Sequence, residues 1–346
     1  MKYLVTGGCG FVGSNIVSRL TRQGESVALF DNLTRHGAAA NLDWLKSLGP
    51  QQFVHGDIRN PHDVDRAISS LMPDVIFHLG GQVAMTTSME NPRHDFEVNV
   101  VGSLNLLESV RRHCPQTTIV YSSSNKVYGG LDSAALVEGA RRYTVPSFPH
   151  GLDETAPLDF QTPYGCSKGA ADQYMLDYAR SFGLKTVVFR HSTIYGGRQF
   201  ATFDQGWVGW FCQQAIAIQN YPSRPPFTIS GNGKQVRDLL FVDDAVDCYL
   251  QAAANIEQTR GQAFNIGGGM DNSCSLLELF DILETLLPIK MIYRELPWRH
   301  SDQKFFVANN AKALRLICWQ PRVTKAVGVA ATLQWAKEQF KSQRQR

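Results

Sequence analysis

The stretch Thr6-Gly7-Gly8-Cys9-Gly10-Phe11-Val12-Gly13 decides the fold. It joins a short apolar run, Lys2–Thr6, to a helical pattern over Phe11–Arg22. Its spaced glycines permit, in order, a tight turn, a close approach of phosphate to the backbone, and close packing of helix on strand. The helix N-terminus adds free N–H groups and the positive end of the helix dipole. Three glycines alone also fit an ordinary turn, but in this context they predict a dinucleotide site.

An acidic residue at the end of the next predicted strand supports the same site. Asp31 follows the run 26–30 and stands about 20 residues after Gly13, the spacing at which an acid binds the ribose 2′-hydroxyl of a dinucleotide. Because a carboxylate repels a 2′-phosphate, the sequence favours NAD over NADP. Arg35 is an opposing signal, since a nearby cation attracts that phosphate.

The first half of the chain alternates short buried strands with helices. Further strands are predicted at 52–58, 74–80, 117–123 and 185–190, and further helices at Pro61–Leu71, 95–112 and 164–182. Near-continuous apolar strands separated by helices predict a parallel sheet covered on both faces. We therefore expect an α/β fold with a doubly wound parallel sheet of the Rossmann type, and a ligand crevice at the carboxyl ends of its strands.

The second half of the chain has more tryptophans and prolines and a less regular alternation. We predict a dinucleotide-binding domain over 1–190 and, over 191–346, a smaller mixed α/β lobe that binds the substrate. A helix predicted at 238–255 returns to the first domain with residues up to 260, so the two parts are interleaved. The connection 130–162 is long for a compact domain. Substrate gating and a plain surface excursion are both open alternatives for it.

Composition and charge exclude several classes of protein. Hydrophobic residues make up 43% of the 346 positions, enough for a sizeable core, and 34 Lys and Arg stand against 31 Asp and Glu. So small a balance does not indicate a nucleic-acid partner. No apolar run approaches the roughly 18 residues of a membrane span, and the seven cysteines include no Cys-x-x-Cys pair. We expect a reduced, cytoplasmic protein with no metal, membrane or nucleic-acid partner.

Two further strand ends point into the same crevice. Asp57 and Ile58 are predicted to hold an adenine ring by a hydrogen bond and by packing. In the run His78-Leu79-Gly80-Gly81 the glycines remove side-chain bulk along the expected path of the cofactor. His78, just before them, is interpreted as a core imidazole with satisfied hydrogen bonds.

A second group of residues is suited to proton transfer. Tyr164 and Lys168 open a predicted helix at positions i and i+4, so they share one face. A nearby ammonium favours the phenolate, which lowers the pKa of a tyrosine from its usual value of about 10. Such a group can take the proton of an alcohol while hydride leaves the carbon. Ser122, Ser123 and Ser124 end a strand expected to lie alongside, where a hydroxyl can orient the alcohol. The pair alone is usually chance, but its occurrence after the glycine turn, the acid and the serines is far more specific.

With these motifs the sequence resembles the extended short-chain dehydrogenase/reductase family, whose members act on nucleotide sugars. The family's Thr-Gly-x-x-Gly-x-x-Gly turn falls on residues 6–13 and its Tyr-x-x-x-Lys pair on Tyr164 and Lys168, and the resemblance runs the full length. Within the family the chain is most similar to epimerases of CDP-linked 3,6-dideoxyhexoses. Ser124 stands where those carry threonine, and Gly80 where the family often has alanine.

The resemblance implies the following roles. Catalysis would rest on Ser124, Tyr164 and Lys168. NAD would contact Gly7, Gly10, Phe11, Val12, Gly13, Asp31, Asn32, Asp57, Ile58, Leu79, Gly80, Gln82, Asn99, Tyr164, Lys168 and His191. The CDP-linked deoxyhexose would contact Ser124, Asn125, Gln205, Trp207, Val208, Arg237 and Arg299. The two arginines are suited to the diphosphate, since guanidinium groups bind phosphate through two hydrogen bonds.

The implied reaction is epimerisation at C-2. NAD+ oxidises the C-2 alcohol to a 2-keto sugar with Tyr164 as base, the sugar turns in its pocket, and hydride returns to the opposite face. No net electrons are lost, so the cofactor is expected to stay bound. The family also implies a homodimer or a homotetramer built on the helices near 99–112 and 164–182.

Two alternative interpretations stay open. One keeps the fold and changes the chemistry to a UDP-hexose 4-epimerase or a sugar 4,6-dehydratase. Dehydratases of the family place Asp-Glu after the strand-end threonine, where this chain has Asn125-Lys126, which argues against dehydration. The other is a binding or regulatory module without catalysis, which would have no need of Tyr164 and Lys168.

Overall fold

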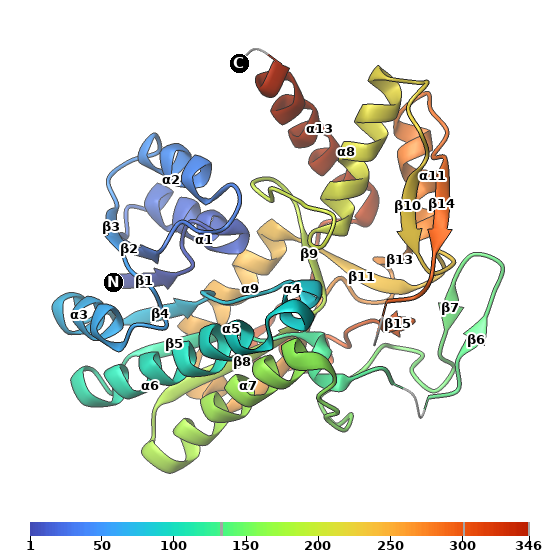
Figure 1. The fold of residues 1–346 in the computed structure, drawn as a ribbon. Coiled ribbons are helices and arrows are strands. Elements are labelled where there is room, and N and C mark those ends of the chain that lie inside the picture. The colour runs from blue at the N-terminus through green and yellow to red at the C-terminus, as the bar shows by residue number, and fades with distance from the viewer. Residues whose placement is uncertain (132–133, 300–301, 345–346) are drawn as a thin grey trace.

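The computed structural model describes residues 1–131, 134–299 and 302–344. Within them, a parallel sheet of seven strands forms the centre of the molecule (Figure 1). Along the sheet the order is β12 (Gln262–Ile266), β8 (Lys185–His191), β5 (Thr118–Ser122), β4 (Val75–His78), β1 (Lys2–Thr6), β2 (Ser26–Asp31) and β3 (Gln52–His55). All neighbouring pairs are parallel. The strand order therefore reverses at β1, and the doubly wound sheet predicted from the sequence is confirmed.

Helices cover both faces of this sheet, because alternate residues of each strand point to opposite sides. In β1, Val5 faces a core that includes helices α1 (Phe11–Arg22), α2 (Ala38–Lys46), α9 (Val242–Ala254) and α12 (Ala311–Ile317). Leu4 faces the opposite core, which includes α3 (Pro61–Leu71), α6 (Gly102–His113) and α7 (Thr162–Phe182). Both faces of the sheet are therefore buried. Polar side chains that contact a ligand must come from the ends of the strands.

Helix α7, which carries the predicted catalytic pair, begins and ends at recognisable signals. Pro163 stands in its first turn, where the missing N–H costs no hydrogen bond, and Gly183 ends it with a φ of +70°. Ala171 and Met175 are fully buried in the core under the sheet. These two positions continue the face that starts at Tyr164, so burial of the helix sets the direction of the catalytic side chains.

The smaller part of the molecule is built on short strands and amphipathic helices. β11 (Val236–Phe241) pairs with β9 (Thr193–Tyr195), β13 (Ser273–Ser275) and β15 (Phe305–Phe306), and β10 (Phe227–Ser230) pairs with β14 (Tyr293–Leu296). A separate hydrophobic core draws on α8 (Trp207–Asn220), α11 (Leu276–Leu286) and α13 (Lys325–Arg344). Helices α8 and α11 and strands β10 and β14 stand at the upper right of Figure 1, with α13 beside α8 at the top. We call this part the second lobe.

The long connection 130–162 packs on the second lobe. It contains a short hairpin of β6 (Val137–Glu138) and β7 (Tyr143–Thr144), and the Leu152 N–H donates to the Val307 carbonyl at 2.7 Å. Leu152 and Val145 are buried with Val236 in a shared apolar cluster. Asp132 and Ser133, within this connection, lie outside the described residues. Its packing makes the connection a part of the second lobe, and its gating role stays a prediction.

The helix predicted at 238–255 begins later than expected. Asp238 through Phe241 belong to β11, and α9 starts at Val242. Asp238 is fully buried and accepts the backbone N–H groups of Gly269 and Ala308. The prediction was wrong here because neither glycine nor proline marks the junction, so an apolar strand runs directly into an apolar helix face. α9 itself packs on α1 and β5, as expected of a segment that returns to the first domain.

Other segments of the second half also join the large sheet. β12 adds a strand beside β8, and α12 covers it. Trp319, counted with the second lobe in the sequence, is buried in the core of the large sheet instead. These segments lie beyond residue 260, outside the predicted boundary of the returning segment. Short helical turns α4 (Met85–Glu90), α5 (Pro92–Phe96) and α10 (Ile256–Thr259) complete the connections.

Candidate active site

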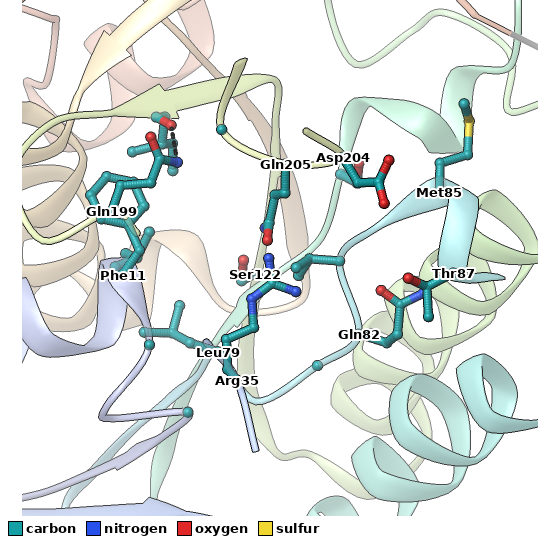
Figure 2. Close-up of a pocket in the computed structure, with 18 of the residues that line it drawn as sticks. Phe11, Arg35, Leu79, Gln82, Met85, Thr87, Ser122, Gln199, Asp204 and Gln205 are labelled. Atoms are coloured by element: carbon teal, nitrogen blue, oxygen red, sulfur yellow. Dashed lines mark hydrogen bonds between the residues drawn. The ribbon is translucent and has the colours of Figure 1, made fainter. Parts of the chain in front are cut away.

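A cavity of about 800 Å³ opens at the carboxyl ends of the central strands, between the large sheet and the second lobe. Figure 2 shows Leu79 and Ser122, at the ends of β4 and β5, on one side of it and Gln199 and Gln205 of the second lobe on another. The predicted residues that line it are Gly7, Gly10, Phe11, Val12, Gly13, Asp31, Asn32, Asp57, Ile58, Leu79, Gly80, Gln82, Ser124, Asn125, Tyr164, His191, Gln205, Trp207, Arg237 and Arg299. The structure therefore brings both predicted sites into one space.

The glycine turn forms the floor of the cavity at the start of α1. Gly7 has a φ of +66°, and a Cβ placed on it would lie 2.8 Å from the Gly80 nitrogen. A Cβ on Gly13 would lie 2.2 Å from the Gly7 carbonyl oxygen. Among the described residues no side chain caps the helix at Gly10. A close-packed backbone that leaves free N–H groups at a helix start is the cradle that a pyrophosphate needs.

Asp31 is fixed beside this turn. Its two carboxylate oxygens accept the backbone N–H groups of Cys9 at 2.9 Å and Leu33 at 2.8 Å. Burial raises the pKa of Asp31, and these two N–H groups oppose that shift. A carboxylate offers about four acceptor positions, so two remain for the hydroxyls of a ribose. The residues present therefore fit a dinucleotide with a free 2′-hydroxyl.

Asp57 lies at the next strand end and is tied to Arg59. The Arg59 guanidinium donates to both oxygens of Asp57, at 3.0 and 2.8 Å, and holds the pKa of that carboxyl well below its usual range. The Asn32 amide donates to the same group at 3.0 Å. Asp57 is thus ionised and immobile at the wall where the adenine ring is expected, with Ile58 beside it.

Asn99 does not line the cavity but supports its wall. It is 1% exposed and lies in a π-helical turn, η1 (Glu97–Val101), which interrupts the helix predicted at 95–112. Its amide donates to the Gln82 carbonyl at 3.1 Å and to the Ser167 hydroxyl at 3.0 Å, and its oxygen accepts the Gln82 N–H at 2.9 Å. Asp95 accepts from the Gln82 and Asn99 amides in the same network. The network fixes the loop after β4 against the start of α7.

The catalytic candidates meet at the end of β5. Tyr164 and Ser124 both line the cavity, and the Ser124 hydroxyl acts to lower the pKa of the phenol. Lys168 lies one turn further along α7, buried behind the cavity wall, with its ammonium donating to the Ser122 carbonyl and 4.5 Å from the centre of the Tyr121 ring. The arrangement can present a hydroxyl pair to one substrate alcohol, with a buried cation beneath it.

The pKa of Tyr164 differs from the sequence-based expectation. Burial raises the pKa of Tyr164 to about 12, with the Ser124 hydrogen bond opposing that shift. The expectation that Lys168 lowers this pKa is not met, because desolvation of the phenolate dominates the shift and the Lys168 ammonium donates to the Ser122 carbonyl. Burial also lowers the pKa of Lys168 to about 8. The positive charge of an oxidised nicotinamide, once bound in this cavity, would favour the phenolate.

Two histidines near the site have distinct roles. His191 lines the cavity, and its Nε2 lies 2.8 Å from the Ser122 hydroxyl, with which it shares a hydrogen bond. Burial lowers the pKa of His191 to about 4, so the imidazole is neutral at pH 7. His78 is fully buried between the Thr6 and Ser103 hydroxyls, at 2.7 and 3.0 Å. The prediction of a satisfied core imidazole at His78 is confirmed.

The second lobe contributes cations to the other half of the cavity. Arg237 donates to Asp302 at 3.1 Å, and both side chains are mostly buried. The Arg299 guanidinium lies 4.8 Å from the centre of the Phe203 ring, and its Nε donates to the Ser230 hydroxyl at 3.3 Å. Both arginines line the cavity, as expected for a diphosphate site.

Of the substrate contacts predicted on and before α8, two line the cavity and one does not. Gln205 and Trp207 line the cavity, and the Trp207 indole N–H donates to the Thr193 hydroxyl at 2.9 Å. Val208 is fully buried in the core of the second lobe, so its side chain does not reach the cavity. The sequence placed Val208 beside its neighbours, but consecutive positions of a helix face different directions.

The sequence analysis assigned no cofactor or substrate contact to several residues that line the cavity or its rim. Arg198, with a φ of +68°, rests its guanidinium 3.9 Å from the centre of the Trp44 ring, and Phe200 packs over Gly37. Arg35 extends into the cavity in Figure 2, with Asp204 electrostatically close to it. Lys126 also lines the cavity. The signal that singles these residues out is spatial, because their partners lie far away in the sequence.

Comparison with known proteins decides the family. The chain matches the NAD dependent epimerase/dehydratase family over residues 3–267. The chain belongs to this family. It is 58% identical to CDP-paratose 2-epimerase of Salmonella typhi, over 97% of this chain and 99% of that protein. It is 30% identical to UDP-glucose 4-epimerase of Mycolicibacterium smegmatis, over 97% and 98% of the two chains. The structure of Thermus thermophilus UDP-glucose 4-epimerase with NAD is 28% identical, with a TM-score of 0.80 and coverage of 97% and 99%.

For this epimerase/dehydratase, the predicted family, the fold, the enzymatic nature and NAD as cofactor are confirmed. The roles of the single residues stay predictions that the geometry above makes specific. Across the described residues, no helix is both long and apolar enough to cross a membrane. The same residues contain no group of three His, Cys, Asp or Glu side chains that could hold a metal ion.

Proposed function

We propose that this protein interconverts CDP-paratose and CDP-tyvelose by epimerisation at C-2, through a transient 2-keto sugar. One observation carries the proposal: 58% identity over 97% of the chain to a CDP-paratose 2-epimerase, against 30% to a UDP-glucose 4-epimerase of equal coverage. A 3-deoxy sugar has no hydroxyl at C-3, so its C-2 alcohol is the group next to the anomeric carbon that can be oxidised. The site supplies what that oxidation requires.

The chain's own residues would act on the alcohol proton. Bound NAD+ supplies an acceptor for the hydride of C-2 and later returns it. Tyr164 takes the proton of the C-2 alcohol and gives it back to the ketone oxygen, while Ser124 holds that oxygen in place. Lys168, one turn further along α7, would hold its positive charge beneath the site through its hydrogen bond to the Ser122 carbonyl. His191, neutral at pH 7, orients the Ser122 hydroxyl at the same edge of the sheet.

The second lobe would hold the nucleotide while the sugar turns. Arg237 and Arg299 line the same cavity as Tyr164, and both guanidinium groups are fixed by neighbours. A diphosphate bound there keeps a reactive ketone from escaping between the two hydride transfers. Asn125, whose amide donates to Gln303 at 2.6 Å, stands in place of the acid that a dehydratase uses. This substitution favours epimerisation over loss of water.

The test uses the purified protein with no added cofactor. Denaturation should release NAD in near-equal amount to the protein, identified by chromatography. The native protein should then convert CDP-paratose to its C-2 epimer, followed by the anomeric and H-2 signals in proton NMR. Turnover of UDP-glucose with none of CDP-paratose would instead establish a 4-epimerase and overturn the proposal.

We further propose that the protein is a cytoplasmic homodimer or homotetramer. Large apolar side chains on α5 and α7 are exposed in the single chain, namely Phe96, Tyr174 and Phe182, at 52%, 43% and 50%. Helices α5 and α7 pack against one another, and α6 runs alongside α7 in Figure 1. Light scattering should give at least twice the chain mass of 38.5 kDa. A Tyr174→Glu variant that stays active as a monomer would support α7 as the contact.

A further inference from the structure

Lys126 lies between the catalytic side chains and the arginines of the second lobe. It occupies a short 3-10 turn, η2 (Asn125–Tyr128), directly after Ser124. Its N–H donates to the Ser124 hydroxyl at 3.2 Å, and its side chain lines the cavity with Tyr164. Lys126 is therefore two residues from a group expected to hold the reacting oxygen.

The turn that carries Lys126 is held rigidly. Asn125 donates to the Gln303 side chain at 2.6 Å, and the Gln303 amide donates in return to the carbonyls of Asn125 and Gly129. Asn125, Val127 and Gln303 are all buried. The Lys126 backbone is therefore fixed beside Ser124, and its side chain enters the cavity from that point.

The surroundings of Lys126 are strongly positive. Arg237 and Arg299 interact with it electrostatically, and Asp302, which pairs with Arg237, is the carboxylate in the same set. Burial and the two guanidinium groups lower the pKa of Lys126 to about 8. Positive side chains gathered along one part of a cavity attract an anionic ligand. The diphosphate of a nucleotide sugar is such an anion.

The position of the reacting carbon decides where that diphosphate must lie. In the sugar, C-2 is bonded to C-1, which carries the phosphate, whereas C-4 is on the far side of the ring. Bringing C-2 to Tyr164 and Ser124 therefore brings the sugar-proximal phosphate close to the same two residues. Bringing C-4 there moves this phosphate away, toward the second lobe. A cation beside Ser124 favours the first placement.

We propose that Lys126 binds the sugar-proximal phosphate and thereby selects C-2 over C-4 as the carbon presented to Tyr164. This rests on the proposed function for the sugar, but the phosphate contact itself can be tested apart from turnover. Lys126 is in this view a specificity-determining residue that acts through the placement of the substrate. The more distant phosphate is left to the arginines.

The binding test compares two ligands that differ only in the second phosphate. Titration calorimetry of the NAD-loaded protein with CDP and with CMP gives the affinity ratio that the second phosphate contributes. Lys126→Met should lower the affinity for CDP about tenfold or more, as expected for a lost charge-assisted hydrogen bond, and leave that for CMP nearly unchanged. Lys126→Arg should restore most of the ratio. Lys304→Met, which removes a cation from the same lobe outside this cavity, is the control and should keep the wild-type ratio.

The regiochemical test uses CDP-paratose, which carries hydroxyls at both C-2 and C-4. Wild-type protein should give the C-2 epimer, and Lys126→Met should give a larger share of C-4 epimer with a raised KM, as measured by NMR of the released sugars. An unchanged CDP-to-CMP ratio in Lys126→Met, or an equal loss for both ligands, would overturn the phosphate contact. An altered ratio with unchanged regiochemistry would overturn the selection of C-2. If the wild type forms no C-2 epimer at all, the proposed function fails, while the binding test still decides the phosphate contact.

Discussion

Replacement of Tyr164 by phenylalanine is the sharpest test of the catalytic site. The change removes one oxygen and keeps the ring, which is 9% exposed and packed at the start of α7. The groups that form the dinucleotide cradle, Gly7, Gly13 and Asp31, do not involve that oxygen. We therefore expect a folded protein with wild-type cofactor content. Loss of a general acid–base group costs about 10²- to 10⁴-fold in rate, which corresponds to a barrier higher by roughly 3–5 kcal/mol.

The assay separates chemistry from folding and from cofactor loss. Turnover of CDP-paratose is measured by NMR, NAD content after denaturation, and thermal stability by calorimetry. Tyr195→Phe is the matched control, because it also removes a buried phenol oxygen, one with no hydrogen-bond partner among the described residues and outside the cavity. Its turnover should equal that of the wild type. Activity of Tyr164→Phe within a few-fold of the wild type would refute the reasoning, as would a loss of turnover that simply followed a loss of NAD.

Three further outcomes are expected. Gly13→Ala should abolish NAD retention, measured as cofactor content after dialysis, because its Cβ would lie 2.2 Å from the Gly7 carbonyl oxygen. Gly10→Ala is the control: its Cβ would lie 3.1 Å from the same oxygen, so this variant should retain far more NAD. Asp172→Asn should lower the free energy of unfolding in urea by about 3–5 kcal/mol, because it leaves the buried Arg190 guanidinium without its carboxylate partner. Asp177→Asn, on the same helix, breaks an exposed ion pair and should lower the free energy of unfolding by less than about 1 kcal/mol. The affinity for CDP should fall as the pH rises through about 8, where Lys126 loses its proton, and titrations of Lys126→Arg should show no such fall.

The elements nearest to local signals were predictable from the sequence. β1, α1 and α3 have the predicted bounds, because a glycine turn starts α1 and the Asn60 side chain caps α3 just before its first-turn proline. The strand predicted at 52–58 ends at His55, since the following residues leave the sheet to form the cavity wall. Local chemistry sets where an element begins, but pairing with neighbours sets where a strand ends.

The parts that failed depend on distant contacts. β11 takes up residues predicted as helix, and Asp238 in it accepts backbone N–H groups about 30 and 70 residues further on. The pKa of Tyr164 depends on burial beneath both lobes, which a Tyr-x-x-x-Lys spacing does not contain. Lys126 was noted only as a departure from an acidic pair. Only the structure shows that Arg237 and Arg299, more than a hundred residues further along the chain, are electrostatically close to Lys126.

The proposed epimerisation removes a hydride from the sugar and later returns it. Neither the cofactor nor the ketone can therefore leave the cavity between the two transfers. The segment 197–206, between β9 and α8, connects the second lobe to the helices that follow the glycine turn. The Asn15 and Asn41 amides, from α1 and α2, donate to its backbone carbonyls at Gly197 and Arg198, at 3.2 and 3.3 Å. In Figure 1 this segment reaches from the second lobe toward α1 and α2. The segment that begins on the helices around the cofactor also carries Gln205 at the substrate end of the cavity. With NAD and the nucleotide sugar bound, this one segment would adjoin both ends of the site, an arrangement that suits a reaction in which both must stay bound between two hydride transfers.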